Sequence, residues 1–140
     1  MIEAIKRLQE LAQSCSWGDG QIHYAPDYPV ENAAVLPFSI AHFGDGSATA
    51  ADASFVKFMP NLFVDFFFAR AQLSTAYRQM DSVIEQYPKL LAGDPTLADT
   101  VVTIRFPITW TEPTRQTYNT LDTLMVRFTV PIKTLPTPTT

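Results

Sequence analysis

The chain has 140 residues, a length that suits one domain, and 46% of them are hydrophobic, which is enough to build a core. Only 17% are charged, so uncharged surface of the kind that often binds other protein chains must remain exposed. The net charge of −4 is concentrated in residues 1–56, which hold two basic and seven acidic residues, a net of −5. The sequence contains no basic patch, which argues against a nucleic-acid-binding protein.

The single cysteine and the hydropathy of the chain further limit the kind of protein that this sequence can encode. Cys15 is the only cysteine, which excludes an intramolecular disulfide and a zinc site built on cysteines. The first residues predict an amphipathic helix and lack the apolar run of a signal peptide, and no stretch of about 18 apolar residues could span a membrane. We therefore expect a protein that is made and assembled in a reducing cytoplasm and has no membrane partner.

The first predicted element is a helix over residues 2–15. Its apolar residues recur at three- and four-residue spacing, and its charged residues lie on the opposite side. Gly18 and Gly20 follow and stop it. Residues 17–34 are rich in aromatic side chains and contain two prolines, so we expect an ordered loop with room for a short strand at residues 22–24.

Strict alternation of apolar and polar residues predicts the strands. Even-numbered positions are apolar and many odd-numbered positions are polar, which is typical of strands with one face on a core and one face open. Pro60, Pro107 and Pro131 each lack a backbone donor and should lie at edges, bulges or strand ends. We predict four strands, at residues 36–42, 56–70, 100–110 and 124–132.

The clearest helix is predicted at residues 73–91, between the second and third strands. Apolar residues there follow i, i+3, i+4, i+7 spacing, and polar residues cover the opposite face. Ser74 or Thr75 can cap its start. Pro88 should kink or end it, and Gly93 suits its C-terminal cap.

Together these elements predict a single α+β domain over residues 1–132, in the order α-β-β-α-β-β. An antiparallel sheet of four strands, or slightly more, should carry both helices on one face. Residues 44–54 join two strands, and we expect a flexible loop because they are small and polar and exceed the usual hairpin turn of about 2–5 residues. Residues 133–140 form a Thr/Pro-rich tail that should be extended.

No pattern in the sequence indicates catalysis, a metal or a cofactor. His23 and His42 are the only histidines, and no spacing of a three-ligand zinc site is present. His42 is predicted on the apolar face of a strand, where a packed histidine is more common than a catalytic base. Gly44-Asp45-Gly46 resembles the start of a calcium loop but lacks the later acids and the terminal glutamate. We expect a protein that is not an enzyme; a small enzyme or ligand-binding domain, with His42 and Tyr24 near a pocket, is the alternative of a different class.

Asp65 interrupts a run of apolar residues on the open face of its strand. It is either an ordinary solvent-facing residue or a position that a neighbouring subunit covers, with Arg105 or Arg127 on an adjacent strand as its basic partner. Phe63 and Phe67 flank it, and two phenylalanines around one acid fit a protein interface. The candidate subunit-interface residues are therefore Phe63, Asp65, Phe67, Arg105 and Arg127.

The order of the elements is similar to that of a known family. An amphipathic helix leads into the strand Leu36-Pro37-Phe38-Ser39-Ile40, a loop with acidic residues follows, and a long strand at residues 62–69 runs straight into a helix. That helix ends in Tyr87-Pro88, and Asp94-Pro95-Thr96-Leu97 precedes the last two strands. Over about residues 2–132, the chain resembles the tail terminator (tail completion) proteins of long-tailed bacteriophages.

This resemblance implies a structural virion protein at the tail–neck junction, assembled in the host cytoplasm. Such proteins form a six-membered ring that caps the head-proximal end of the tail tube, ends tube polymerisation and offers a docking surface to the head connector. The implied partners are copies of the same chain, the major tail tube protein and connector or neck proteins, while DNA passes through the ring without sequence-specific binding. The candidate contacts with the tube are Gly44, Asp45, Gly46 and Asp52. Another neck or head–tail adaptor protein, which differs only in what it contacts, is the alternative within the same class.

Overall fold

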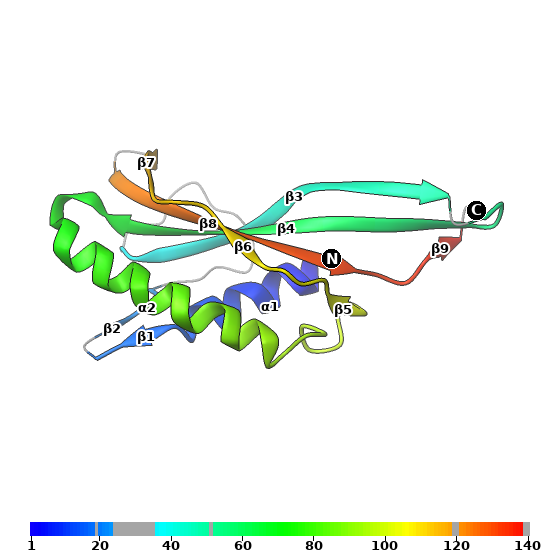
Figure 1. Ribbon diagram of the computed structural model, residues 1–140, viewed down its shortest axis with the longest axis horizontal. Helices are drawn as coiled ribbons and strands as arrows, with labels where there is room; N and C mark the ends of the chain where they lie inside the picture. The colour runs from blue at the N-terminus through cyan, green and yellow to red at the C-terminus, as the bar shows by residue number, and fades with distance from the viewer. Residues whose placement is uncertain (19, 24–35, 51, 119–120, 139–140) are drawn as a thin grey trace.

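The computed structural model describes residues 1–18, 20–23, 36–50, 52–118 and 121–138. The chain is an α+β protein with an antiparallel sheet and two helices (Figure 1). Both helices, α1 (Ile2–Gln13) and α2 (Leu73–Ala92), lie on the same side of the sheet in this view. The fold class and the two helices were therefore predicted correctly, but the strands differ from the prediction in number, bounds and facing.

Three long antiparallel strands form the centre of the sheet, in the spatial order β3-β4-β8. Short strands line the outer edge of β8, a further strand near the C-terminus pairs with the far end of β4, and a separate two-stranded ribbon follows α1. The long strands are β3 (Phe38–Ala50), β4 (Phe55–Ala69) and β8 (Leu121–Lys133). The short ones are β1 (Ser16–Trp17), β2 (Gly20–Gln21), β5 (Thr103–Ile104), β6 (Thr109–Trp110), β7 (Thr114–Tyr118) and β9 (Thr137–Pro138).

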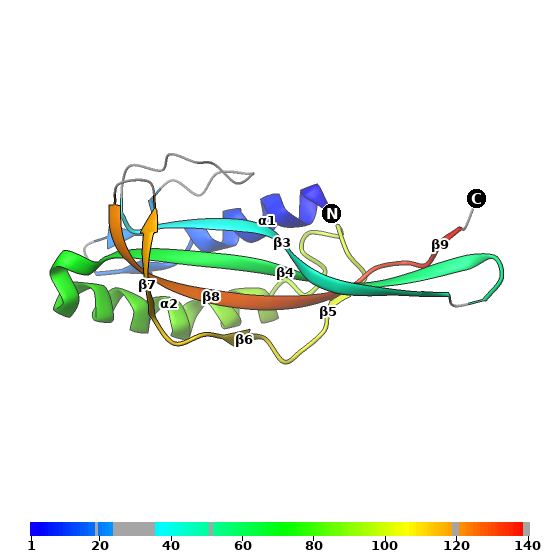
Figure 2. The ribbon, with the colours of Figure 1, turned by 90° about the horizontal axis from the view of Figure 1, so that it is seen from above.

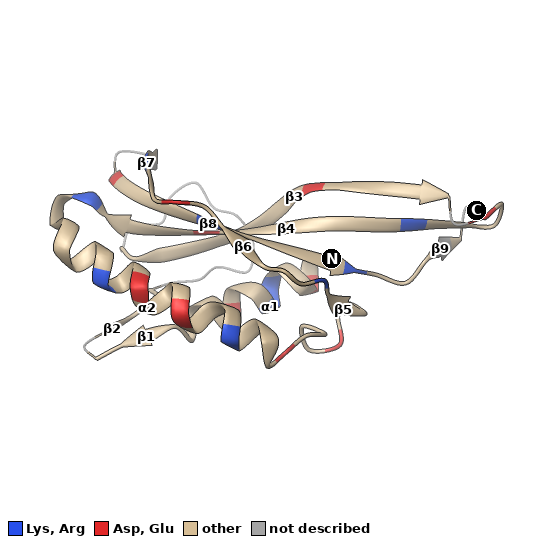
Figure 3. Cartoon of the chain, in the orientation of Figure 1, with Lys and Arg blue, Asp and Glu red and all other residues tan. Residues whose placement is uncertain are grey.

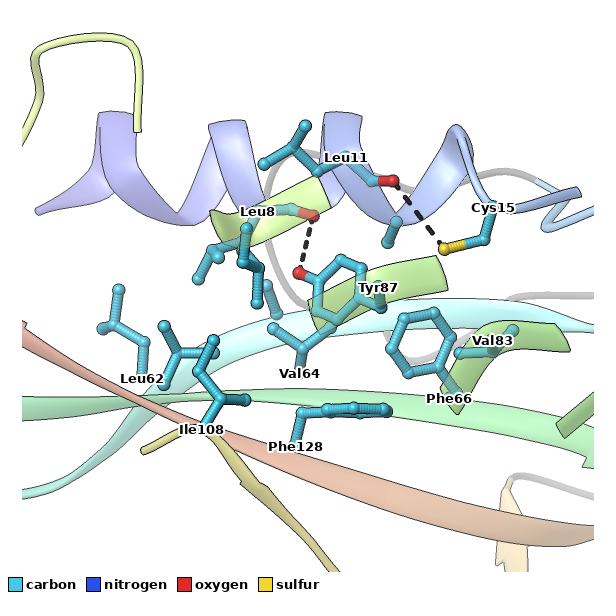
Figure 4. Close-up of a cluster of buried hydrophobic side chains, with 14 of the residues drawn as sticks. Leu8, Leu11, Cys15, Leu62, Val64, Phe66, Val83, Tyr87, Ile108 and Phe128 are labelled. Carbon is cyan, nitrogen blue, oxygen red and sulfur yellow. Dashed lines mark hydrogen bonds between the residues drawn. The ribbon is translucent and has the colours of Figure 1, made fainter. Parts of the chain in front are cut away.

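The core lies between the helices and the sheet face formed by the even-numbered residues of β4 and β8. The rings of Phe66, Tyr87 and Phe128 meet edge to face, with centroids 5.1 to 5.4 Å apart (Figure 4). The hydroxyl of Tyr87 donates a hydrogen bond to the carbonyl oxygen of Leu8 at 3.0 Å, which ties α2 to α1. All four residues are fully buried, so the predicted facing of β4 and β8 is correct.

The predicted facing of β3 is wrong. The ladder pairs Phe38 with Phe67 and Ile40 with Asp65, so even-numbered residues of β3 lie beside odd-numbered residues of β4. Phe38, Ile40 and His42 therefore lie on the face away from the helices, and Ala41 lies in the core. Alternation within one strand gives two faces but does not say which of them meets the core, because the connection to the next strand sets that choice.

The predicted third strand, residues 100–110, is divided into β5 and β6, which pair with separate parts of β8. Pro107 lies between them and cannot donate to a ladder, which accounts for the interruption. Ile104 and Ile108 are buried as predicted, whereas Phe106 and Trp110 are exposed. The expected order α-β-β-α-β-β is therefore too simple for this edge of the sheet.

Helix α2 begins at the predicted residue and ends one residue later than predicted, but its start is not capped as expected. It follows a short 3-10 turn (η1, Arg70–Gln72), its N-cap is Gln72, and no side chain caps its start, so the predicted cap by Ser74 or Thr75 is wrong. Pro88 does not end the helix, which continues to Ala92 and is followed by Gly93 at the cap position. Burial of Leu91 offsets the backbone hydrogen bond that Pro88 removes.

The short strand predicted at residues 22–24 is not present at the residues that the structure describes. Ile22 and His23 follow β2 without being in a strand, and Tyr24 lies outside the described residues.

The largest correction concerns residues 44–54, which were predicted to be a flexible loop. Strand β3 continues through this segment to Ala50, and β4 begins at Phe55, so most of the segment belongs to a long β-hairpin. Its outer half extends past both helices (Figures 1 and 2). We call residues 46–50 of β3 with residues 55–60 of β4 the arm.

Candidate functional site

Asp65 lies on the sheet face that points away from the helices, where β4 is flanked by both other long strands. Its neighbours across the two ladders are Ile40 and Arg127. Arg127 donates two hydrogen bonds to the carboxylate, from Nε to Oδ1 at 2.8 Å and from Nη2 to Oδ2 at 3.1 Å. Nε2 of His42 lies 2.8 Å from Oδ2. Asp65 is only 5% exposed within a single chain, so it is not a solvent-facing residue.

The electrostatics of this group favour the ionised carboxylate. Burial raises the pKa of Asp65, but the hydrogen bonds from His42 and Arg127 outweigh it and hold the pKa below its ordinary value. The hydrogen bond to Asp65 raises the pKa of Arg127 in turn. The Nδ1 atom of His42 lies 3.1 Å from the carbonyl oxygen of Phe43, so both ring nitrogens face oxygen atoms.

Phe63 completes this group, which we call the Asp65 cluster: Asp65, Arg127, His42 and Phe63. The guanidinium carbon of Arg127 lies 4.6 Å from the centroid of the Phe63 ring, a cation–π geometry. The His42 ring meets Phe63 edge to face at 5.6 Å. The side chains of Arg127 and His42 are 36% and 26% exposed, so the cluster can meet solvent or a partner through both.

The structure brings together three of the five candidate interface residues, Phe63, Asp65 and Arg127. Phe67 is buried in a separate apolar cluster, where its ring stacks on Phe38 with centroids 4.9 Å apart. Arg105 is not near Asp65; its Nε donates to the carbonyl oxygen of Ile132 at 3.1 Å. The expected open aromatic face is therefore not open at Phe67, which is buried together with Phe38 and Ile40.

The alternation of residues did not reveal His42 as a partner of Asp65. The even-numbered residues of β3 are mostly apolar, like those of β4, and this pattern predicted His42 on the core face. The register of the hairpin is the signal that could have revealed this pair. His42 lies directly opposite Phe63, which is two residues from Asp65 on the same face of β4.

The candidate tube contacts Gly44, Asp45 and Gly46 form a β-bulge at the base of the arm. The ladder passes from the pair Phe43–Leu62 to the pair Gly46–Pro60, so two residues of β3 stand opposite one residue of β4. A bulge bends its strand and increases the local twist, and β3 changes direction here in Figure 1. The motif therefore sets the direction of the arm.

Both glycines are required by close contacts. A Cβ atom at Gly44 would lie 2.8 Å from the carbonyl oxygen of Asn61, and one at Gly46 would lie 2.8 Å from Cα of Pro60. Asp45 accepts a hydrogen bond from Nδ2 of Asn61 at 2.9 Å. Within the described part of the chain, no group of three or more His, Cys, Asp or Glu residues could hold a metal ion.

Asp52, the fourth candidate tube contact, shapes the tip of the arm. Its Oδ1 accepts hydrogen bonds from the backbone nitrogens of Ser54 at 2.7 Å and Phe55 at 3.1 Å. This side chain-to-backbone pattern is typical of aspartate in a turn. Asp52 thus has a structural role at the end of the molecule farthest from the helices.

An apolar groove lies where the arm leaves the body. Its volume is about 670 Å³, and its lining includes Ala48, Phe58 and Pro60 from the arm, Met1 at the start of α1, and Leu135. Asp45 is the only acidic or basic side chain in this lining, and Figure 3 shows few charged residues along the arm. The even-numbered face of β4 thus continues as apolar surface beyond the end of the helices.

No protein-family model matches the chain, and no curated protein matches it. In the described residues, neither helix is long and apolar enough to cross a membrane. What the chain does must therefore be inferred from its own surfaces.

The alternative of a histidine pocket gains no support from the described residues. His23 lines a separate hollow of about 430 Å³ together with Trp17 and Arg78, and His42 is not part of that lining. His42 is instead bound to Asp65. Tyr24, its proposed companion, lies outside the described residues.

Proposed function

We propose that this chain is a structural protein of a long-tailed bacteriophage, which forms a ring on the head-proximal end of the tail tube. The ring ends tube polymerisation and provides the docking surface for the head connector. Two kinds of support meet here: the order of the elements resembles the tail terminator family, and the chain carries an arm with no core of its own. The arm is the observation on which the proposal chiefly rests.

An isolated two-stranded ribbon is marginally stable in water, and β9 adds only two paired residues to the arm. The arm pairs five residues of β3 with five of β4 and lies beyond both helices. Phe55 and Phe58 are 40% and 41% exposed on it, an unfavourable arrangement unless another protein covers them. A strand ribbon with exposed aromatic residues is therefore suited to reach a neighbouring subunit or the tube.

The charge distribution supports contact with protein. The groove at the base of the arm is apolar, and Lys57 is the only basic residue on the arm. A contact between the arm of one copy and the body of the next is head to tail, and such contacts close into rings when the rotation permits. DNA would then pass through the ring without sequence-specific binding. A sibling neck or adaptor protein would use the same surfaces toward different partners.

The test is complementation of a phage that lacks this protein. The arm must be shortened on both strands, because removing residues 48–53 alone would leave Phe58 without its partner on β3. A balanced variant replaces residues 48–58 with Asn-Gly, which joins the paired residues Ser47 and Met59 by a two-residue turn. Glu85→Gln, on the exposed side of α2, is the matched control.

We expect the shortened variant to fold and to keep the cooperative unfolding transition of its core. In the phage, it should give overlong or headless tails in electron micrographs. The Glu85→Gln control should restore tails of normal length. Normal tails and full infectivity with the shortened arm would show that the arm does not make the contact that ends the tube.

A further inference from the structure

The C-terminal segment leaves the sheet and returns to it farther out along the same strand. Strand β8 pairs with β4 as far as Asn61 and Pro131, and β9 pairs with Val56 and Phe55 on the arm. Pro60 and Pro131 lack backbone donors at the place where the two strands separate. We call residues 134–138, which include β9, the tail. The outer edge of β4 therefore accepts an extended segment of this sequence in antiparallel register.

The tail is attached loosely within its own chain. Leu135 is 74% exposed. It borders the groove of about 670 Å³, a hollow of about 320 Å³ beside Phe55, and a third hollow of about 270 Å³ beside Thr100. The tail's apolar side chain thus lies at the rim of three hollows and fills none of them.

We propose that in the assembled ring the tail is exchanged between subunits: β9 of one copy pairs with the arm of the next, and Leu135 enters the groove of that next copy. This inference rests on the proposed ring. The occupant is a second copy of this chain because the receiving edge already pairs with this segment, so exchange keeps the same backbone hydrogen bonds. Exchange of an identical element between protomers is a low-cost route to assembly.

The geometry of the exchange agrees with ring closure. Each subunit donates its tail to one neighbour and accepts the tail of the other neighbour on its own arm, so two different surfaces of the chain are used. Such a contact is head to tail, and it closes into a ring when the rotation between neighbouring subunits permits. The exchange would also cover Phe58 and Leu135, both exposed in the single chain.

A cysteine cross-linking experiment on the full chain tests this proposal. Phe55 and Pro138 are direct partners in the ladder, so cysteines at both positions lie within reach of a disulfide. Cys15 does not interfere, because it is buried and burial raises the pKa of its thiol to about 12. One preparation carries only Phe55→Cys, another only Pro138→Cys, and the two are mixed before assembly and then oxidised.

Exchange predicts a covalent dimer on a non-reducing gel, containing about half of the chains, because random mixing brings the two variants together in the productive order at about one interface in four. Chains carrying both cysteines should give a covalent ladder. Thr49→Cys mixed with Lys57→Cys is the matched control, since these partners lie within one arm and should yield only the background of random collision.

Three results overturn the proposal and differ in what they imply. If rings form but the mixed preparations give no dimer above the control, the tail stays on its own arm; the ring then stands and the exchange is wrong. A disulfide from Leu135→Cys to a cysteine-bearing tube protein, in place of one to a second copy, would show that Leu135 contacts the tube and not the groove of a second copy. A chain that stays monomeric at high concentration and on the tube refutes both the exchange and the proposed function.

Discussion

The structure of the Asp65 cluster predicts that removing Arg127 and removing Asp65 destabilise the chain to different extents. Arg127→Met removes the bidentate partner and leaves a carboxylate whose side chain is 8% exposed, with His42 as its remaining partner. Asp65→Asn leaves a guanidinium whose side chain is 36% exposed and can be hydrated. We therefore expect Arg127→Met to destabilise the chain more than Asp65→Asn does.

The magnitudes follow from burial. Breaking a fully buried ion pair from one side costs about 3–5 kcal/mol. Arg127 is more than a third exposed, so solvent screening reduces this figure to about 3 kcal/mol for Arg127→Met and about 1–2 kcal/mol for Asp65→Asn. In the double variant no charge is left buried, so its loss should be clearly smaller than the sum of the two single losses.

Urea unfolding followed by circular dichroism at pH 7 measures all four members of this cycle, with equal slopes required for the comparison. Additive losses, or a larger loss for Asp65→Asn than for Arg127→Met, would refute the account of the cluster. Asp65→Lys would place a second cation beside Arg127 and should unfold the chain, so it is not a clean test of assembly.

The same cluster predicts a pH dependence. Because the folded pKa of Asp65 lies below its ordinary value of 3.8, the unfolded chain takes up this proton first as the pH falls. The stabilisation by Asp65 is therefore complete above about pH 5 and is lost as the pH falls from there through the lowered folded pKa. The stability of Asp65→Asn should fall less steeply than that of the wild type over this acid range; parallel curves would contradict the assignment.

Three further substitutions test the core and the base of the arm. Phe128→Ala should cost about 3–5 kcal/mol in urea unfolding, because the ring is fully buried, and an unchanged midpoint would show that the facing of β8 is wrong. Tyr87→Phe removes the donor to the carbonyl of Leu8 and should cost about 1–2 kcal/mol, whereas a neutral result would mean that the carbonyl finds another partner. Gly46→Val should open the arm to proteases because its Cβ meets the backbone of Pro60, while Gly93→Ala, with its nearest contacts at 3.5 Å, should not; equal cleavage would refute the close contact.

The sequence by itself determined the fold class, both helices and the core facing of β4 and β8. Amphipathic spacing and alternation are properties of local backbone geometry, so Phe66, Tyr87 and Phe128 could be placed in the core before any contact was known. The same local geometry predicted correctly that a long strand runs into α2.

Tertiary structure decided the facing of β3, the arm and the Asp65 cluster. Residues 44–50 are small and polar, and strand propensity alone predicts a loop there; pairing with β4 supplies the backbone hydrogen bonds that make them a strand. The ladder pairs even with odd residues between β3 and β4, and that single offset brings His42 to the side of Asp65 and removes Phe38 from the main core. Such an offset is set by the turn and the bulge that join β3 to β4, so alternation within either strand could not reveal it.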